Sequence, residues 1–481
     1  MPTCQHAEII RPGDFVARNH FYPRVIDAQA HPVVQDFFHL SSETILSLFC
    51  ERNPHIDIKA LADLLQYQCS YFSWAGTDLV YAQATDESRH MVVLETNSCS
   101  SGQKQMPSIK NESKYRGYER LLGGMQATLT NKEQLNGELA VIYDKNKMEA
   151  SGYASTLSDL TGKTVFLAPY HERTSHSPVR FSNGVLEVRD ADHSWHPISF
   201  AIRYVTQRPW NRIPLHTVTK IVNPVIACLA GGRNKLMAHK AYELFNSAYA
   251  HKGLKIKTPK TICNVKKGEI PRVWDQLGRA AVVKMPYSNA GQEIYIITNE
   301  HELEKFMVMD HPYEEFIAQS LIGSKWHMRE GKCEFYQRGT LSQNRDGRFA
   351  FDLRMVVTNH QGGFQPVALF SRRAKKPLDS IAHASNSWDV FGTNLSYKSS
   401  EGEWKSDESR LIPVTCEEFE SLGMGLDELV EAYIQTVMSV VAIDKWADTL
   451  MNQGSGFEPD LFMKMNGDRK LFQEMLLPIY E

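Results

Sequence analysis

The sequence predicts an α/β (α+β) protein of two or three domains. Its 481 residues exceed what one hydrophobic core usually supports. Short apolar runs alternate with a polar, helical stretch between residues 137 and 170, which is typical of an α/β layer. From Lys235 onward the pattern changes to a second set of helical and extended segments. We therefore expect three units, which span residues 1–215, 216–320 and 321–481.

The N-terminal unit begins with helical patterns and continues with strands. Residues 41–70 predict helices, with Ser42 or Thr44 as an N-cap. Residues 90–107 predict a strand that runs into a polar loop. Residues 137–146 and 163–170 predict two strands with a helix between them, and 196–214 predicts a strand that ends in a proline-bearing loop.

The C-terminal half is richer in helical signals. Residues 234–251 carry apolar side chains at helical spacing, and Asn299 with Glu302 forms a capping pattern before a helix over 297–309. Residues 314–323 predict a strand, and 426–450 predict the longest helix. The apolar runs "PDLFMKM" and "KLFQEML", joined by "NGD", predict a hairpin near the C-terminus.

Composition excludes several classes of function. A formal charge of −3 favours neither nucleic acid nor an anionic membrane as a partner. No apolar run is long enough to span a bilayer, and the first residues lack the pattern of a secretory signal. The eight cysteines are scattered without a CxxC or a zinc-type spacing, which indicates reduced thiols and a cytoplasmic protein.

One lysine suggests an anion-binding site. Lys284 ends the apolar run "AVVKMP", where a charge is costly unless an anion meets it. The small, polar stretch "YSNAGQ" follows directly and contains Ser288 and Gly291. Lys235 lies 49 positions earlier, at the start of a helical segment. Two ammonium groups suit a polyphosphate.

These segments, in this order, resemble the ATP-grasp superfamily of carboxylate–amine ligases over about residues 230–480. The later "FDLRMVV", "SRRAKK" and "GTNLSYK" resemble glutamate ligases and tubulin-tyrosine-ligase-like enzymes, with D-alanine–D-alanine ligases as further relatives in type. The resemblance implies an ATP-grasp fold preceded by a pre-grasp α/β region. It also implies that Lys235 and Lys284 bind ATP phosphates, and that Ser288 and Gly291 belong to a loop that closes over them.

The resemblance assigns further residues. "FIAQSLIG" matches the hinge strand, so Gln319, Ser320 and Leu321 are expected at adenine, whereas the usual ribose-binding glutamate is replaced by Lys325. Arg354 and Arg373 are expected to be catalytic at phosphate or carboxylate oxygens, and Asn394 is expected near the nucleotide. By itself, "RRAKK" reads equally well as a solvated basic patch.

Magnesium is the metal that the resemblance implies. Family members present an acid on one strand and a Glu-x-Asn on the next. Here Asp460 and Glu474 are the expected ligands, across the C-terminal hairpin, and Leu476 stands at the asparagine position. Carboxylates of this kind suit a hard cation.

The implied reaction joins a carboxylate to an amine through an acyl-phosphate, with ATP and Mg²⁺ as cofactors. The substrates are expected to be small molecules, such as an amino acid and an amine, and a homodimer is left open. Two alternatives remain: a degenerate nucleotide-binding regulator, or a phosphotransferase that acts on a hydroxyl.

The N-terminal half leaves two choices open. The loop "LETNSCSSGQKQMP" holds Glu95, Asn97, Cys99 and Lys104. It reads as a substrate-recognition loop or a structural turn, and an amidase with Cys99 as nucleophile is the less favoured third interpretation. The arginines Arg203, Arg208 and Arg212 bind an anionic substrate or, as we slightly prefer, pair with acids at the domain junction.

Overall fold

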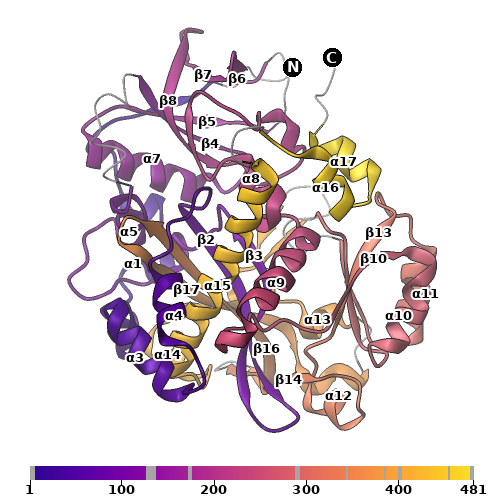
Figure 1. Ribbon diagram of the computed structural model, residues 1–481. Helices are drawn as coiled ribbons and strands as arrows, with labels where there is room; N and C mark the ends of the chain where they lie inside the picture. The colour runs from indigo at the N-terminus through magenta and orange to yellow at the C-terminus, as the bar shows by residue number, and fades with distance from the viewer. Residues whose placement is uncertain are drawn as a thin grey trace.

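The computed structural model describes residues 6–125, 137–171, 176–287, 293–342, 345–383, 386–398, 404–452 and 456–476. Within these ranges the protein is mixed α/β, as the sequence predicts, with two seven-stranded sheets and one four-stranded sheet. Figure 1 shows one seven-stranded sheet at the top, beside both chain ends, and the four-stranded sheet at the right.

The first sheet has the strand order β1–β5–β4–β8–β7–β6, with β9 beside β8. β4 pairs in parallel with β5 and with β8, and helix α7 connects β4 to β5, which confirms the predicted strand–helix–strand pattern. The ends of parallel strands meet at one edge of a sheet, so the loops after β4 and β8 lie together. The elements are β1 (Glu8–Ile10), β4 (Glu138–Tyr143), α7 (Lys147–Thr161), β5 (Val165–Pro169), β6 (Val179–Ser182), β7 (Val185–Arg189), β8 (Trp195–Tyr204) and β9 (Lys220–Val222).

The four-stranded sheet is antiparallel, in the order β10–β13–β11–β12. Helix α11 follows β12, and its N-cap Asn299 accepts a hydrogen bond from the Glu302 amide at 3.0 Å, as the capping pattern predicts. The elements are β10 (Thr261–Lys266), α10 (Ile270–Gln276), β11 (Ala281–Lys284), β12 (Ile294–Ile297), α11 (Glu300–Val308) and β13 (Glu315–Ser320).

The other seven-stranded sheet joins both halves of the chain. Its order is β14–β2–β16–β17–β20, with β3 beside β2 and β15 beside β16. The central strands β2 and β16 pair directly although about 270 residues separate them in sequence. The boundaries at 215 and 320 stay predictions, but this sheet crosses both of them. The strands are β2 (Trp74–Ala84), β3 (Arg89–Ser98), β14 (Phe335–Gln337), β15 (Thr340–Ser342), β16 (Arg345–His360), β17 (Gly363–Pro377) and β20 (Leu411–Ile412).

Two long helices support this sheet. α15 (Leu426–Met451) is the predicted long helix, and it packs on β3, β16 and α9 (Lys235–Tyr249). Both helices cross the centre of the molecule in Figure 1. Most of α15 is apolar and buried, so it forms the middle of the hydrophobic core. The core thereby holds β3 and the first turn of α9 in fixed relative positions.

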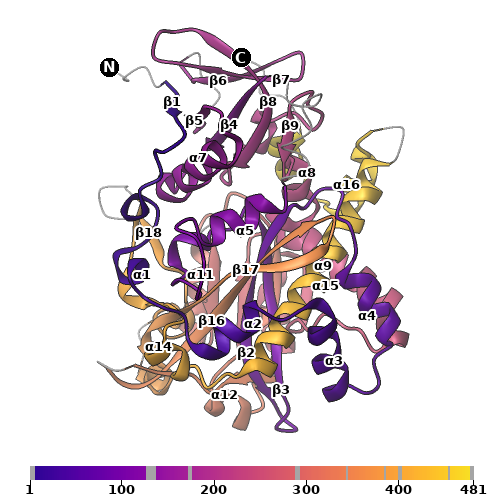
Figure 2. The same cartoon turned by 90° about the vertical axis from the view of Figure 1, so that its left-hand side faces the viewer.

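Shorter elements complete the described chain. Figure 2 shows α2, α3 and α4 on the side of this sheet that is away from the four-stranded sheet. Helix α3 begins one residue after its cap, which is Ser41 rather than Ser42 or Thr44. The elements are α1 (Pro23–Ile26), α2 (Pro32–Phe38), α3 (Ser42–Arg52), α4 (Ile58–Leu65), α5 (Gly117–Gly123), α8 (Val225–Ala227), α12 (Lys325–Arg329), α13 (Trp388–Phe391), β18 (Ser396–Lys398), β19 (Trp404–Ser406) and α14 (Cys416–Glu420).

The predicted C-terminal hairpin is wrong. The two runs form helices, α16 (Pro459–Met465) and α17 (Arg469–Leu476). Their apolar residues recur at helical spacing, Pro459 is well placed in a first turn, and Phe462 packs against Phe472 with ring centroids 6.2 Å apart. Among the described helices, none is both long enough and apolar enough to cross a membrane.

Candidate active site

A cavity of about 710 Å³ lies where the three large sheets meet. Its lining comes from β2 and β3, from β11 and β13, from β16 and β17, and from the loops after β4 and β8. Both halves of the chain therefore contribute side chains to one site.

Lys235 and Lys284 line this cavity from two different elements. Lys284 is the last residue of β11, and Lys235 is the first of α9. The Lys235 amide donates a hydrogen bond to the Pro286 carbonyl at 2.8 Å, so the start of the helix is attached to the chain just after β11. Asn234 caps α9 by accepting from the Met237 amide at 3.3 Å. The two lysines are thus held at the same end of the cavity.

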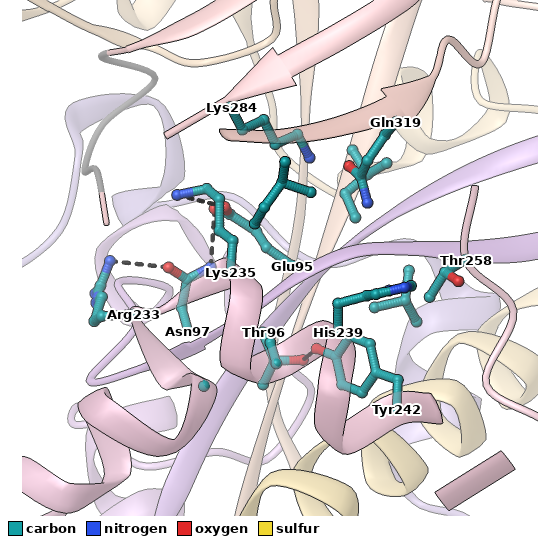
Figure 3. A pocket seen from close by; sticks show the side chains of 15 residues that line it. Glu95, Thr96, Asn97, Arg233, Lys235, His239, Tyr242, Thr258, Lys284 and Gln319 are labelled. Carbon is teal, nitrogen blue, oxygen red and sulfur yellow. Dashed lines mark hydrogen bonds and ion pairs between the residues drawn. The ribbon is translucent and has the colours of Figure 1, made fainter. Parts of the chain in front are cut away.

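A half-buried carboxylate accompanies these lysines. Glu95 on β3 forms an ion pair with Lys235, with Nζ and Oε2 3.6 Å apart, and Figure 3 shows Glu95 together with both lysines. Burial lowers the pKa of Lys284 to about 8, and Glu95 opposes this shift while Lys235 adds to it. Burial alone would raise the pKa of Glu95, but Lys235 and Lys284 hold it below its ordinary value. An anion beside Lys284 would favour the charged ammonium and so raise this pKa.

A second group of charges surrounds Asp78 on β2. Arg354 holds Asp78 with two hydrogen bonds, from Nε at 2.5 Å and Nη2 at 2.6 Å, and Arg372 Nη2 lies 2.9 Å from the same carboxylate. Arg372 also binds Asp352, at 2.9 Å from Nε and 2.5 Å from Nη2. Burial alone would raise the pKa of Asp78, but the two arginines hold it well below its usual range. Burial raises the pKa of Asp352, against the effect of Arg372.

The second expected arginine is replaced by its neighbour. Arg354 lines the cavity as expected, but Arg372 lines it in place of Arg373. Successive side chains on a strand point to opposite faces, so only one of two adjacent arginines on β17 can face the cavity. Arg373 instead donates to the Ser409 carbonyl at 2.8 Å.

An acid and a Glu-x-Asn occur on neighbouring strands in the N-terminal hairpin. Asp78 on β2 pairs directly with Glu95 on β3, and Asn97 lies two residues further along β3. All three line the cavity. This is the pattern that the resemblance led us to seek near the C-terminus. In the sequence these residues lie in "GTDLV" and "LETN", which precede Lys235 and Lys284. The resemblance led us to expect the metal ligands after the two lysines.

Asp460 and Glu474, the expected magnesium ligands, do not face each other across a hairpin. They belong to separate helices, and Asp460 is exposed and outside the cavity lining. No cluster of three or more histidine, cysteine, aspartate or glutamate residues that could hold a metal occurs in the described part of the chain. The N-terminal set has two carboxylates and one amide.

That donor set fits a magnesium ion. Asp78, Glu95 and Asn97 offer only oxygen atoms, which a hard cation prefers. Each donor is now bound by a protein cation: Asp78 by two arginines, Glu95 by Lys235, and Asn97 Oδ1 by Arg233 at 2.9 Å. The set is therefore built to interact with positive charge beside the two lysines.

The expected hinge residues also line the cavity. Gln319 and Ser320 are the last two residues of β13, and Leu321 follows directly. The amide of Ser320 donates to the Lys260 carbonyl at 2.9 Å, and that of Leu321 donates to the Ala280 carbonyl at 3.0 Å. These two amides are thus already used within the protein. Apolar side chains close this end of the cavity, namely Val282, Ile296, Leu321 and Phe391.

The other expected residues differ in position. Asn394 lines the cavity, and its carbonyl accepts a hydrogen bond from Arg410. Lys325 begins α12, is exposed and does not line the cavity. Ser288 and Gly291 lie outside the described residues.

Cys99 and the three arginines of the N-terminal half differ in their surroundings. Burial raises the pKa of the Cys99 thiol to about 11, which disfavours the thiolate that an amidase nucleophile needs. Arg203 donates to the Asn223 carbonyl at 2.5 Å, and Arg212 pairs with Asp144 at 2.8 Å, so both hold the interior together. Arg208, however, lines the cavity.

No protein-family model matches the chain, and no curated protein sequence matches it significantly. Among solved structures it is similar to a glutathione synthetase-like effector from Globodera pallida, with 10% identity, a TM-score of 0.38, and 76% of this chain and 87% of that chain covered. D-alanyl-alanine synthetase A from Vibrio cholerae matches with 11% identity and a TM-score of 0.30, covering 63% of this chain and 98% of its own.

A RimK domain ATP-grasp protein from Sphaerobacter thermophilus matches with 12% identity and a TM-score of 0.29, covering 48% of this chain and 90% of its own. Every one of these TM-scores is below 0.5, so these similarities decide neither the fold family nor the function of this chain. The function proposed below therefore rests on the geometry of the site.

Proposed function

We propose that the protein is an ATP- and Mg²⁺-dependent ligase of the ATP-grasp type, which joins a carboxylate to an amine and releases ADP and phosphate. One observation carries this proposal: Lys235 and Lys284 share one end of a large cavity with the oxygen donors Asp78, Glu95 and Asn97. A nucleoside triphosphate with its metal requires cationic side chains for its phosphates and, next to them, oxygen donors for a divalent metal ion.

The residues divide the work by charge. Lys235 and Lys284 bind the phosphate oxygens, and the apolar wall near Leu321 receives the nucleobase. Asp78, Glu95 and Asn97 would hold Mg²⁺, which when bound neutralises charge on the phosphates. Arg354 stands beside Asp78 and binds oxygens of the reacting groups, as a planar guanidinium does well.

The chemistry needs no nucleophile from the protein. A carboxylate oxygen of the substrate attacks the terminal phosphorus of ATP, and ADP leaves with the electron pair of the broken bond. The amine then attacks the acyl carbon, phosphate departs with its electron pair, and the amine loses a proton to water. Positioning and charge neutralisation supply the catalysis.

The test is release of ADP from ATP and Mg²⁺ in the presence of pooled carboxylic acids and amines, with products identified by mass spectrometry. A condensation product that is one water lighter than its two parts, formed together with ADP, supports the ligase. A phosphorylated hydroxyl compound without an amide would make the protein a phosphotransferase. Nucleotide binding without turnover would make it a regulatory binding protein. The same assay includes the variant Glu95→Gln, which alters a proposed magnesium ligand. Its matched control is Asp460→Asn, because Asp460 is exposed and lies outside the cavity.

We further propose that the substrates are small molecules and that the protein acts in the cytoplasm. The charge of −3 and the absence of paired thiols among the described cysteines support this proposal. A homodimer is part of the same proposal, and sedimentation of the purified chain tests it.

A further inference from the structure

The cavity carries an excess of positive charge. Its described lining has four carboxylates and eight basic side chains. The carboxylates are Asp78, Glu95, Glu293 and Asp352, and the basic residues are Lys104, Lys145, Arg208, Arg233, Lys235, Lys284, Arg354 and Arg372. Concentrated charge of one sign inside a protein is costly unless a ligand of the opposite sign neutralises it.

Each of the four carboxylates already has a cationic partner. Asp78 is bound by Arg354 and Arg372, and Asp352 by Arg372. Glu95 pairs with Lys235, and Glu293 lies 3.8 Å from Arg208. Four cations in the lining have no ion pair with any described residue: Lys104, Lys145, Arg233 and Lys284. Lys284 is explained by the proposed nucleotide site, so three cations are left over.

These three cations occupy the side of the cavity that the N-terminal half builds. Lys145 and Asn146 follow β4 and precede α7, and Lys104 donates a hydrogen bond to Asn146 while its Nζ lies 4.7 Å from the centre of the Tyr22 ring. Arg233 donates to Asn97 Oδ1 at 2.9 Å and to the Cys99 carbonyl at 3.3 Å. Every one of these acceptors is neutral.

Arg233 and Lys104 are both close enough to Lys145 to repel its ammonium group. The pKa of Lys145 is lowered to about 8, chiefly by burial and also by Arg233 and Lys104, against the effect of Asp144. Asp144 itself is held by Arg212 and by the amides of Thr206 and Gln207. We call the region bounded by Lys104, Lys145 and Arg233 the acid chamber. Ser101, Gln105 and Tyr204 add neutral donors to the same lining.

The balance of charge suggests what the acid chamber holds. The formal excess in the lining is four positive charges, and a nucleotide triphosphate with one Mg²⁺ brings about two negative charges. Roughly two positive charges are left for the other substrate. One carboxylate beside Arg354 is the group to be activated, so a further anionic group is needed at the acid chamber.

We propose that the acid chamber binds a second anionic group of the carboxylate substrate, either a carboxylate or a phosphate, so that the substrate class is a polyanionic acid. The inference rests on the proposed function for the role of the first carboxylate. The chamber itself can be tested without turnover.

The test measures how fast individual lysines of the full chain react with an amine-acylating reagent. The labelled protein is then digested, and mass spectrometry of the peptides gives the extent of acylation at each lysine. A non-hydrolysable ATP analogue and Mg²⁺ are present throughout, and acetate, glutarate, tricarballylate or phosphonoacetate is added at equal ionic strength. Glutarate, tricarballylate or phosphonoacetate, each of which has at least two anionic groups, should slow the acylation of Lys104 and Lys145 about fivefold or more relative to acetate. The exposed Lys59 on α4 is the matched control and should not change.

Two further results separate this inference from the proposed function. In the turnover assay, Lys145→Met should raise the KM for the acid about tenfold or more and leave that for ATP unchanged. Polyanion protection without ADP release would support the chamber and overturn the ligase. ADP release with monocarboxylic acids, together with no protection of Lys104 and Lys145 beyond that of Lys59, would support the ligase and overturn the chamber. Stronger protection by tricarballylate than by phosphonoacetate would identify the second anionic group as a carboxylate, and the reverse would identify it as a phosphate.

Discussion

Nucleotide binding should weaken as the pH rises above 8, because Lys284 loses its proton there in the empty site. The pKa of Lys284 is lowered from 10.5 to about 8 by burial. A phosphate beside the ammonium favours the charged form and so raises this pKa toward its ordinary value. Binding above pH 8 must therefore take up a proton, and the affinity falls as the pH rises toward 10.5.

The magnitude follows from linkage between the two pKa values. If the bound state restores the ordinary pKa, the dissociation constant rises about fifteenfold between pH 8.0 and pH 9.5, which is roughly 1.6 kcal/mol. At pH 9 the complex takes up about 0.9 proton per nucleotide.

Calorimetric titration with a non-hydrolysable ATP analogue measures both quantities, in two buffers that differ in their heat of ionisation. Lys284→Arg keeps a charge at all these pH values, so its affinity should vary little with pH. Lys59→Met, on the exposed face of α4, should behave as the unchanged protein does. Proton uptake near zero at pH 9, or the same pH dependence in Lys284→Arg, would refute the reasoning.

Three other predictions test the site. Glu95→Gln should raise the Mg²⁺ concentration needed for half-maximal ADP release about tenfold or more, whereas Asp460→Asn should not alter it, as a magnesium titration would show. Arg372→Met should lower the free energy of unfolding by about 3–5 kcal/mol, since it leaves the buried carboxylate of Asp352 without its cation while Asp78 keeps Arg354. Arg373→Met should lower it by less than about 1 kcal/mol; urea denaturation measures both, and equal losses would contradict the assignment. Cys99→Ala should retain ADP release, since that thiol is no nucleophile, and loss of activity in a folded variant would count against this.

Local signals in the sequence were sufficient for many elements. The cap of α11 at Asn299, the parallel strands around α7, and the long α15 all depend on residues that are close together in the chain. The C-terminal segment shows the limit of such signals. Short apolar runs fit both a strand and a helix, and packing of Phe462 against Phe472 accompanies the helical outcome.

The site was only partly visible in the same way. Lys284 stood out because it ends an apolar run, and Lys235 because it lies at the start of a helical segment. The structure brings both to one cavity. The sequence led us to choose Arg373 instead of Arg372. Which of the two faces the cavity depends on the register of β17 with β16, and of β16 with β2. The roles of all these residues stay predictions.

The sequence by itself determined the α/β class, most helices and the two lysines, since each follows from periodicity or from a charge next to an apolar run. Only the tertiary structure decided that Asp78, Glu95 and Asn97 stand beside those lysines, and that three further cations face the same cavity. The physical reason is the pairing of β2 with β16, which joins segments about 270 residues apart. Backbone hydrogen bonds between strands do not depend on chain order, so no local pattern could reveal which strands meet.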